Sequence, residues 1–204
     1  GEVSKVQVFV AVLGASGYTF VHATKSQTLK DFILSHTKAF DFFGGVPNVL
    51  VPDNLKSAII SNNKKGIVEN ESYSELARHY DCVISPARPR KPKDKPKAEQ
   101  GVQGIQRWLI AVLRNRIFFN VDEINEALSP LLDRYNNKVM KHISKSRNEL
   151  FLELDSPVLH PLPNNKFIYK EFKIAIVHLD YHVELHKCFY SVPYKKKKKK
   201  VEIR

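Results

Sequence analysis

Sulfur-containing residues and tryptophan are scarce in this chain of 204 residues, which contains two cysteines, one methionine and one tryptophan. Cys82 and Cys188 are too few for a disulfide scaffold, and neither belongs to a CxxC pair of the kind that zinc sites use. We therefore expect a protein of a reducing compartment, the cytoplasm.

Long apolar runs are also missing. The longest, residues 6–14 and 108–113, fall far short of the ~20 apolar residues that a bilayer-spanning helix needs. The first residues lack the order of a signal peptide, in which a basic stretch precedes an apolar one. The sequence predicts no membrane segment, and 43% hydrophobic with 26% charged residues is typical of a globular protein.

Acidic residues are outnumbered, with 21 against 33 lysines and arginines, which gives a net charge of +12. Two segments hold nearly all of this excess, residues 86–97 and residues 195–204. Clustered positive charge attracts polyanions, nucleic acid first and an anionic membrane surface second, although such a run can also be a solvated loop. The basic residues of the first segment are Arg88, Arg90, Lys91, Lys93, Lys95 and Lys97.

The hydrophobic pattern of the first 85 residues predicts an α/β chain. Two apolar, β-branched runs separated by a glycine-containing turn indicate a hairpin. Thr28 and Asp31 have capping-box spacing before a helical stripe that ends at Gly44-Gly45. The predicted elements are strands at 6–13 and 18–24, the capped helix, a strand at 48–51, a polar loop, a helix at 72–80 and a strand at 82–85.

The second half of the chain begins with prolines at 86, 89, 92 and 96, which predict an exposed, semi-extended loop. Periodic apolar positions then indicate helices at 98–117 and 122–135, with a short one near 146–154. From residue 167 onward the pattern is typical of a small separate β module, with strands at 172–185, 188–192 and 201–203.

Three histidines, at 178, 182 and 186, have the spacing of a metal-binding helix face. However, residues 177–186 alternate strictly between apolar and polar side chains, which predicts a strand. Residues four apart on a strand lie about 13 Å from one another, too far to share one ion. We therefore favour a polar strand face over a metal site.

Two carboxylates stand where chemistry could use them. Asp53 follows a short buried strand, and Glu99 lies in the first turn of the helix that leaves the basic loop. Sites in open α/β sheets form at the carboxyl ends of strands, and paired carboxylates suit a hard cation such as Mg²⁺. On spacing alone, Asp53 also fits a turn former and Glu99 a residue favoured by the helix dipole.

Four segments resemble one known family over nearly the whole chain. They are VFVAVLGASGYTF, FDFFGGVPNVLVPDNLKSA, ARPRKPKDKPKAEQGVQ, and DYHVE followed by FYSVPY. These segments resemble the transposase subunit of insertion sequences that move with a separate ATPase helper, the IstA group. More distantly, the order of elements resembles the catalytic core of retroviral integrases and of phage Mu transposase.

The resemblance implies an RNase H-like mixed sheet flanked by helices, and an Asp, Asp, Glu triad that binds two divalent ions, Mg²⁺ or Mn²⁺. By motif position, Asp53 matches the second Asp and Glu99 the Glu. The basic loop, Gln103 and Arg107 would contact DNA. The implied partners are the transposon ends, target DNA, the ATPase helper and further copies of the chain, in the bacterial cytoplasm near the nucleoid.

The sequence departs from the family pattern in two places. The first Asp belongs on a central strand just upstream of the hairpin, where this sequence starts with Gly1-Glu2-Val3. Six consecutive lysines, 195–200, stand where relatives have a mixed turn. We expect an incomplete catalytic core at residues 1–118, a helical connector at 119–163 and an unfinished β-barrel-like module at 164–204, inactive on its own because it lacks the first Asp.

The sequence thus predicts a DNA transposase that cleaves donor ends and transfers them into target DNA. A DNA-binding or assembly fragment without catalytic activity is the alternative. A general RNase H-type nuclease is a third reading, against which the C-terminal β module argues.

Overall fold

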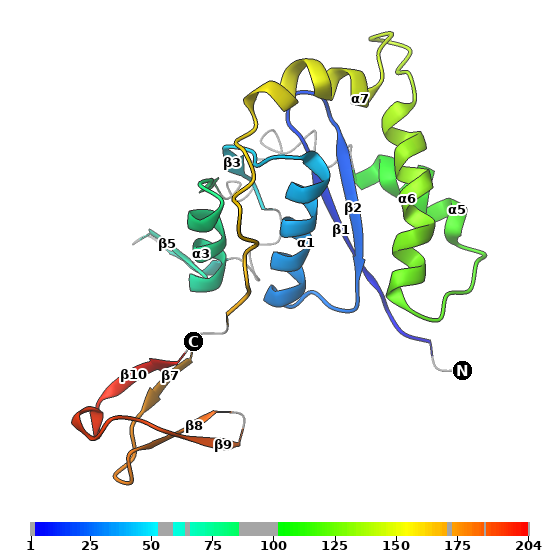
Figure 1. The fold of residues 1–204 in the computed structure, drawn as a ribbon. Helices are drawn as coiled ribbons and strands as arrows, with labels where there is room; N and C mark the ends of the chain where they lie inside the picture. Colours follow the sequence, from blue (N-terminus) through cyan, green and yellow to red (C-terminus); the bar gives the residue numbers. More distant parts are fainter. Residues whose placement is uncertain are drawn as a thin grey trace. The chain divides into compact units, whose positions relative to one another are not determined.

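The computed structural model describes residues 3–52, 59–63, 66–85, 102–170, 173–185 and 187–203 (Figure 1). The chain divides into two compact units, residues 1–167 and 168–204, and each is described by itself. None of the helices in the described ranges is long and apolar enough to cross a bilayer.

The predicted hairpin is confirmed. Strands β1 (Gln7–Val12) and β2 (Thr19–Thr24) pair antiparallel, with Gln7 opposite Thr24 and Val12 opposite Thr19. The turn between them closes when the Leu13 amide donates to the Tyr18 carbonyl at 2.9 Å. Every residue of β2 is buried, whereas β1 is mostly half-buried and exposes Val8. The more apolar strand is thus the less covered one.

Helix α1 (Leu29–Phe43) begins and ends where its sequence predicts. The Thr28 side chain accepts a hydrogen bond from the Asp31 amide, and Gly44 ends the helix in the left-handed conformation at φ 68°. Its buried face includes Ile33, His36 and Phe40. The capping residues and the apolar stripe therefore define the same helix.

Strand β3 (Val49–Leu50) and strand β6 (Val83–Ile84) form a parallel pair, and helix α3 (Glu71–His79) precedes β6. Between them lies an antiparallel hairpin of β4 (Ile59–Asn63) and β5 (Gly66–Glu69). The prediction of a simple polar loop for this stretch was wrong. The β-branched residues at 59–60 and 67–68 favour strands, but the many polar residues around them favour a loop.

A second group of helices follows the basic segment. Helical residues begin at Val102, pass through a π-helical segment, η2 (Gln106–Ile110), and end with α5 (Ala111–Leu113). The predicted helix at 98–117 therefore ends earlier than expected, and residues 98–101 lie outside the described residues. The later helices are α6 (Val121–Asn137), α7 (Arg147–Leu150), η3 (Phe151–Asp155) and η4 (Ser156–Val158).

The core of the first unit joins the hairpin, α1, the helix that includes η2, and α6. One stripe from each of these elements meets in a single cluster of buried side chains. Figure 1 shows α1 and α6 beside the β1–β2 hairpin, and both helices contact β2. The cluster includes Leu13, Phe20, Val21, Ala39, Phe43, Ile105, Leu109, Leu113, Leu128, Leu132 and Phe151.

Two asparagines of α6 close the outer edge of β2. Asn136 accepts from the Thr19 amide at 3.1 Å and donates to the Thr19 carbonyl at 2.8 Å. Asn125 does the same at Ala23, at 2.8 Å and 3.1 Å. Each side-chain amide thus satisfies the backbone groups that a neighbouring strand would otherwise pair with. The sheet cannot grow past β2.

The opposite edge of the hairpin is different. Among the described strands, β1 pairs with β2 alone and β3 pairs with β6 alone, so the two pairs form separate two-stranded sheets. Val49, Val51 and Val83 are exposed beside the parallel pair, as Val8 is on β1. Among the described strands, the second edge of β1 and the free edges of β3 and β6 therefore have no strand partner.

The second unit contains two antiparallel pairs. Strand β7 (Lys173–Ile176) pairs with β10 (Lys200–Ile203), and β8 (His182–Leu185) pairs with β9 (Cys188–Ser191). The single strand predicted at 172–185 was wrong, because the chain turns at residues 178–181. The His178 amide donates to the His182 carbonyl at 3.0 Å, and Tyr181 has φ 64°.

Two buried histidines bond to groups on α1: His36 is part of this helix, and His22 lies on β2. Ring nitrogen Nδ1 of His36 donates to the Phe32 carbonyl at 2.8 Å, so Nε2 accepts from the Tyr73 hydroxyl at 3.2 Å. His22 donates from Nδ1 to Ser35 and accepts at Nε2 from the Lys38 ammonium. Burial lowers the pKa of both histidines to about 4, and at His22 the Lys38 charge adds to the effect on the pKa. Both rings are neutral in the folded protein.

This arrangement predicts that the protein loses stability as the pH falls from about 6.5 toward about 4, because in that range the unfolded chain protonates His36, whose folded-state pKa is about 4. The loss ends near the folded-state pKa. Thermal unfolding across this range should show a shallower pH dependence for His36→Gln than for the parent. The exposed His142→Gln is the matched control, and an unchanged slope in His36→Gln would contradict the assignment.

Candidate active site

The two predicted carboxylates and the basic loop lie outside the described residues. This holds for Asp53, for Glu99 and for the DNA-binding set Arg88, Arg90, Lys91, Lys93, Lys95 and Lys97. The structure does describe the chain on both sides of these residues, together with Gln103 and Arg107. The site is therefore built from the elements that lead into it.

Strands β3 and β6 carry the chain toward one edge of their sheet. They run parallel, with Leu50 opposite Ile84, and the Ser85 amide donates to the Leu50 carbonyl at 2.8 Å. Parallel strands end at the same edge of a sheet, which is where ligands bind in open α/β folds. Asp53 follows Leu50 by three residues, and the basic segment follows Ile84 by two.

The helix beyond the basic segment presents one buried and one exposed line of side chains. Ile105, Leu109 and Leu113 are buried, whereas Gln103 and Arg107 are exposed. Positions four apart drift by about 40° in a regular α-helix, and the wider turns of η2 counteract this drift. Gln103 and Arg107 are therefore brought onto one exposed face, and their contact with DNA stays a prediction.

The same helix packs against the C-terminal end of α6. A methyl group at Gly104 would meet the phenol ring of Tyr135, and the Lys138 ammonium lies 3.4 Å from the centre of the Trp108 ring. Sequence reasoning missed both contacts, as well as the π-helical segment. A glycine inside an apolar helical pattern was the available signal, because glycine disfavours a helix unless something packs against it.

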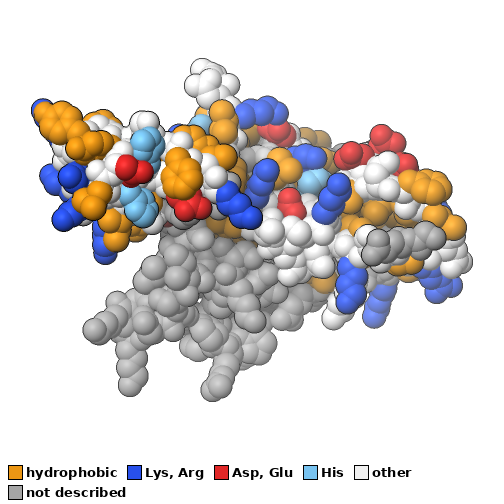
Figure 2. All heavy atoms as spheres, turned by 90° about the horizontal axis from the view of Figure 1, so that it is seen from below, with side chains coloured by type: hydrophobic (Ala, Val, Ile, Leu, Met, Phe, Trp, Pro, Cys, Tyr) orange, Lys and Arg blue, Asp and Glu red, His pale blue; other side chains and the backbone are white. Residues whose placement is uncertain are grey.

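The described titratable groups supply no second site. Within the described ranges, no three His, Cys, Asp or Glu side chains gather closely enough to hold a metal ion, and His186 lies outside these ranges. Burial, with a smaller contribution from the Asp81 charge, raises the pKa of the Cys82 thiol to about 11, so the thiol stays protonated near neutral pH. On the face drawn in Figure 2, described lysine and arginine side chains are interspersed with acidic ones.

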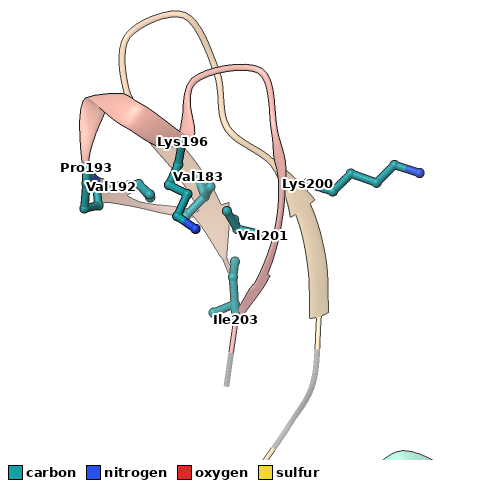
Figure 3. Close-up of a pocket in the computed structure, with 7 residues that line it drawn as sticks. All are labelled: Val183, Val192, Pro193, Lys196, Lys200, Val201 and Ile203. Atoms are coloured by element: carbon teal, nitrogen blue, oxygen red, sulfur yellow. The ribbon is translucent and has the colours of Figure 1, made fainter.

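The second unit contains a shallow pocket of about 580 Å³ (Figure 3). Its floor is apolar, and the Lys200 side chain points away from it. Lys195–Lys200 are all exposed, on η5 (Tyr194–Lys196), the turn after it and the first position of β10. The lining residues are Val183, Val192, Pro193, Lys196, Lys200, Val201 and Ile203.

Comparisons by sequence find transposases. The chain is 47% identical over 195 residues to "Putative transposase y4bL/y4kJ/y4tB" of Sinorhizobium fredii (strain NBRC 101917 / NGR234), covering 96% of this chain and 38% of that protein. It is 42% identical over 204 residues to "Putative transposase for insertion sequence IS1162" of Pseudomonas fluorescens, covering 100% of this chain and 36% of that protein. The IS21 transposase of Pseudomonas aeruginosa is 29% identical over 194 residues, covering 95% of this chain and 49% of the transposase. No protein-family model matches the chain.

Comparisons by structure find retroviral integrases. A chain of the simian T-cell lymphotropic virus intasome, in complex with PP2A regulatory subunit B56 gamma, matches 85% of this chain and 57% of its own, with a TM-score of 0.58 and 19% identity. The HTLV-2 integrase catalytic core domain, in complex with magnesium, matches 72% of this chain and 86% of its own, with a TM-score of 0.54 and 18% identity.

These comparisons confirm the resemblance and the α/β, RNase H-like fold. The chain spans less than half the length of the transposases named above. Its sequence is similar to parts of insertion-sequence transposases, the IS21 transposase among them, and its fold resembles that of retroviral integrase catalytic cores.

Proposed function

We propose that this chain is the catalytic-core portion of an insertion-sequence transposase, which cleaves the donor ends and joins them to target DNA. The observation that carries the proposal is the parallel β3–β6 pair, found in a homologue of transposases. It directs Pro52, which precedes Asp53, and Ser85, which precedes the basic segment, to one edge of the sheet. A DDE-type polynucleotidyl transferase needs its carboxylates and its phosphate-binding residues at such an edge.

Asp53 and Glu99 would hold the divalent ions. Two carboxylates form a hard oxygen donor set that fits Mg²⁺ or Mn²⁺, and phosphate oxygens commonly complete it. When bound, such ions activate the attacking oxygen and stabilise the leaving oxygen of an in-line displacement. The basic residues of 88–97, with Gln103 and Arg107, would hold the DNA backbone in register beside the carboxylates.

The family's first Asp would lie on a strand that pairs with the inner edges of β1 and β3. Both edges lack a partner among the described strands, and α6 closes the only other edge of the hairpin. A strand between β1 and β3 would lie beside Val8 of β1 and Val49 of β3 and would join the two pairs into one mixed sheet. We propose that this strand comes from outside residues 1–204, so that these residues alone are inactive.

The remaining parts of the proposal concern the whole protein. Residues 1–118 would form its catalytic core, 119–163 a connector and 164–204 part of a barrel-like module built on the two strand pairs of the second unit. Transposition joins two DNA ends, so the active form would contain several copies of the chain, acting in the bacterial cytoplasm at the nucleoid. The ATPase helper would be a further partner.

Strand transfer by the full-length protein tests the proposal. With Mg²⁺ and a DNA duplex that carries the transposon end, the parent should join this end to a target plasmid. Asp53→Asn and Glu99→Gln should each lower the joining rate by at least about 10³-fold while duplex affinity changes little, because only the metal ligands are lost. Glu71→Gln, at an exposed ion pair, is the control.

Three other results would contradict this reading. Unchanged joining in both carboxylate variants would remove Asp53 and Glu99 from the site. DNA binding without any joining by the parent would favour the assembly fragment. Degradation of any duplex without end specificity would favour a general nuclease.

The basic segment should dominate the salt dependence of duplex binding. Replacing Arg88, Arg90, Lys91 and Lys93 by alanine should flatten the log-log salt slope by up to about 3.6, since each phosphate contact contributes about 0.9. The same number of alanines at Lys195–Lys198 is the control, and it should change the slope less because that run lies in the separate β unit. Equal salt slopes in the two variants would show that the basic segment is a solvated connector and not the main DNA-binding element.

A further inference from the structure

The end of α6 and the chain that follows it form a third basic cluster. Residues 134–147, bounded by Asp133 and Glu149, contain three lysines and two arginines but no acidic residue. Acidic residues elsewhere in the chain offset this cluster, so the net charge of the whole chain does not reveal it. All of its residues belong to the part of the chain that the structure describes. Its exposed cations are Arg134, Lys138, Lys141 and Lys145.

Hydrogen bonds close the loop between α6 and α7, which Figure 1 shows beyond the ends of the two helices. The Met140 amide donates to the Lys145 carbonyl at 3.0 Å, and these two residues form an antiparallel bridge. The Ser144 amide donates to the Met140 carbonyl at 2.8 Å, with Ser144 in the left-handed conformation at φ 57°. Lys141 lies inside this closed turn. Because the backbone is already fixed, a ligand need not order it.

Two of the five cations stabilise the loop itself. The guanidinium carbon of Arg147 lies 4.0 Å from the centre of the Tyr135 ring, and Nη1 of Arg147 donates to the Tyr135 carbonyl at 3.3 Å. Lys145 pairs with Glu153. The other three cations have no acidic partner within ion-pair distance among the described residues. Their charges are therefore available to a ligand from outside the chain.

These three cations lie beside the helix that carries Arg107. Arg134 and Lys138 are four positions apart at the end of α6, a spacing that brings side chains onto one helix face. The Lys138 ammonium lies 3.4 Å from the centre of the Trp108 ring, which is 52% exposed. Trp108 directly follows Arg107 in the exposed part of its helix. The cation–π contact thus joins the loop to the surface that carries Arg107.

We propose that Arg134, Lys138 and Lys141 form a second phosphate-binding surface, which holds the backbone of the duplex that Arg107 contacts. The inference rests on the proposed function, which supplies DNA as the ligand. Contacts of this kind add affinity and fix the register of the duplex without reading its sequence. Val139 and Ile143 are exposed in the same loop, so an acidic protein surface is the competing ligand. The contact with the Arg107 helix favours DNA.

The test measures binding of the full-length protein to a duplex that carries the transposon end. Replacing Arg134, Lys138 and Lys141 by glutamine should flatten the log-log salt slope by up to about 2.7 for each bound chain, since each phosphate contact contributes about 0.9. Lys141→Gln alone should flatten it by up to about 0.9. Ethylation of single phosphates should weaken binding of the parent at positions where it no longer affects the triple variant, because those contacts are already lost.

The matched control removes the same charge at the opposite end of the hairpin. Asn136, at the end of α6, bonds to Thr19, whereas Asn125, near its start, bonds to Ala23. The control lysines flank the Ala23 end of the hairpin and are exposed. Their replacement by glutamine should leave the salt slope and the ethylation pattern like those of the parent. They are Lys5, Lys25 and Lys30.

A salt slope and an ethylation pattern that match the parent in the triple variant would overturn the inference and leave the proposed function intact. Parent-like DNA binding with a loss of oligomers in sedimentation would assign the loop to a protein partner, which overturns it too. The predicted losses in a protein whose parent joins no DNA ends would support the inference and contradict the proposed function. A parent that binds no duplex would overturn both.

Discussion

The first unit depends on α1, which packs against the β1–β2 hairpin and also against α3, the helix that contacts β6 of the β3–β6 pair. A two-stranded sheet alone is marginally stable in water, so each pair needs a helix against it. His36 provides the junction, because its ring lies 4.9 Å from the ring of Phe9 on β1 and accepts a hydrogen bond from Tyr73 on α3. One turn further along α1, the centre of the Phe40 ring lies 4.8 Å from the centre of the Tyr80 ring, and Tyr80 precedes β6 in the chain. The neutral state of His36 therefore helps to hold β1 and α3 against α1.

The same architecture determines at which edges a further strand can be added. Asparagine side chains of α6 occupy the outer edge of β2, while the inner edges of β1 and β3 remain available among the described strands. A strand added between them would be central, and its end would lie near the ends of β3 and β6. The proposed site therefore depends on the same unpaired edges that leave the two strand pairs as separate sheets.

Much of this fold could be predicted from the sequence where local chemistry decides the structure. Thr28, Asp31 and Gly44 define α1, and the alternation of turn and apolar residues defines the hairpin. Other elements could not be predicted. Polar composition hid the β4–β5 hairpin, and strict alternation of apolar and polar residues hid the turn at 178–181. The π-helical segment was also missed. The contact between Gly104 and Tyr135 joins residues 31 positions apart, and no local pattern indicates which side chain fills the space beside a glycine. Asp53 and Glu99 were found by motif, and their convergence stays a prediction.

The central claim is that Asp53 and Glu99 form one metal site at the edge where β3 and β6 end. Anomalous diffraction from Mn²⁺ in crystals of the full-length protein with transposon-end DNA tests it most directly. The account predicts an ion coordinated by both carboxylates and by a phosphate oxygen. Carboxylates on opposite sides of the sheet, with Mn²⁺ bound elsewhere, would contradict it.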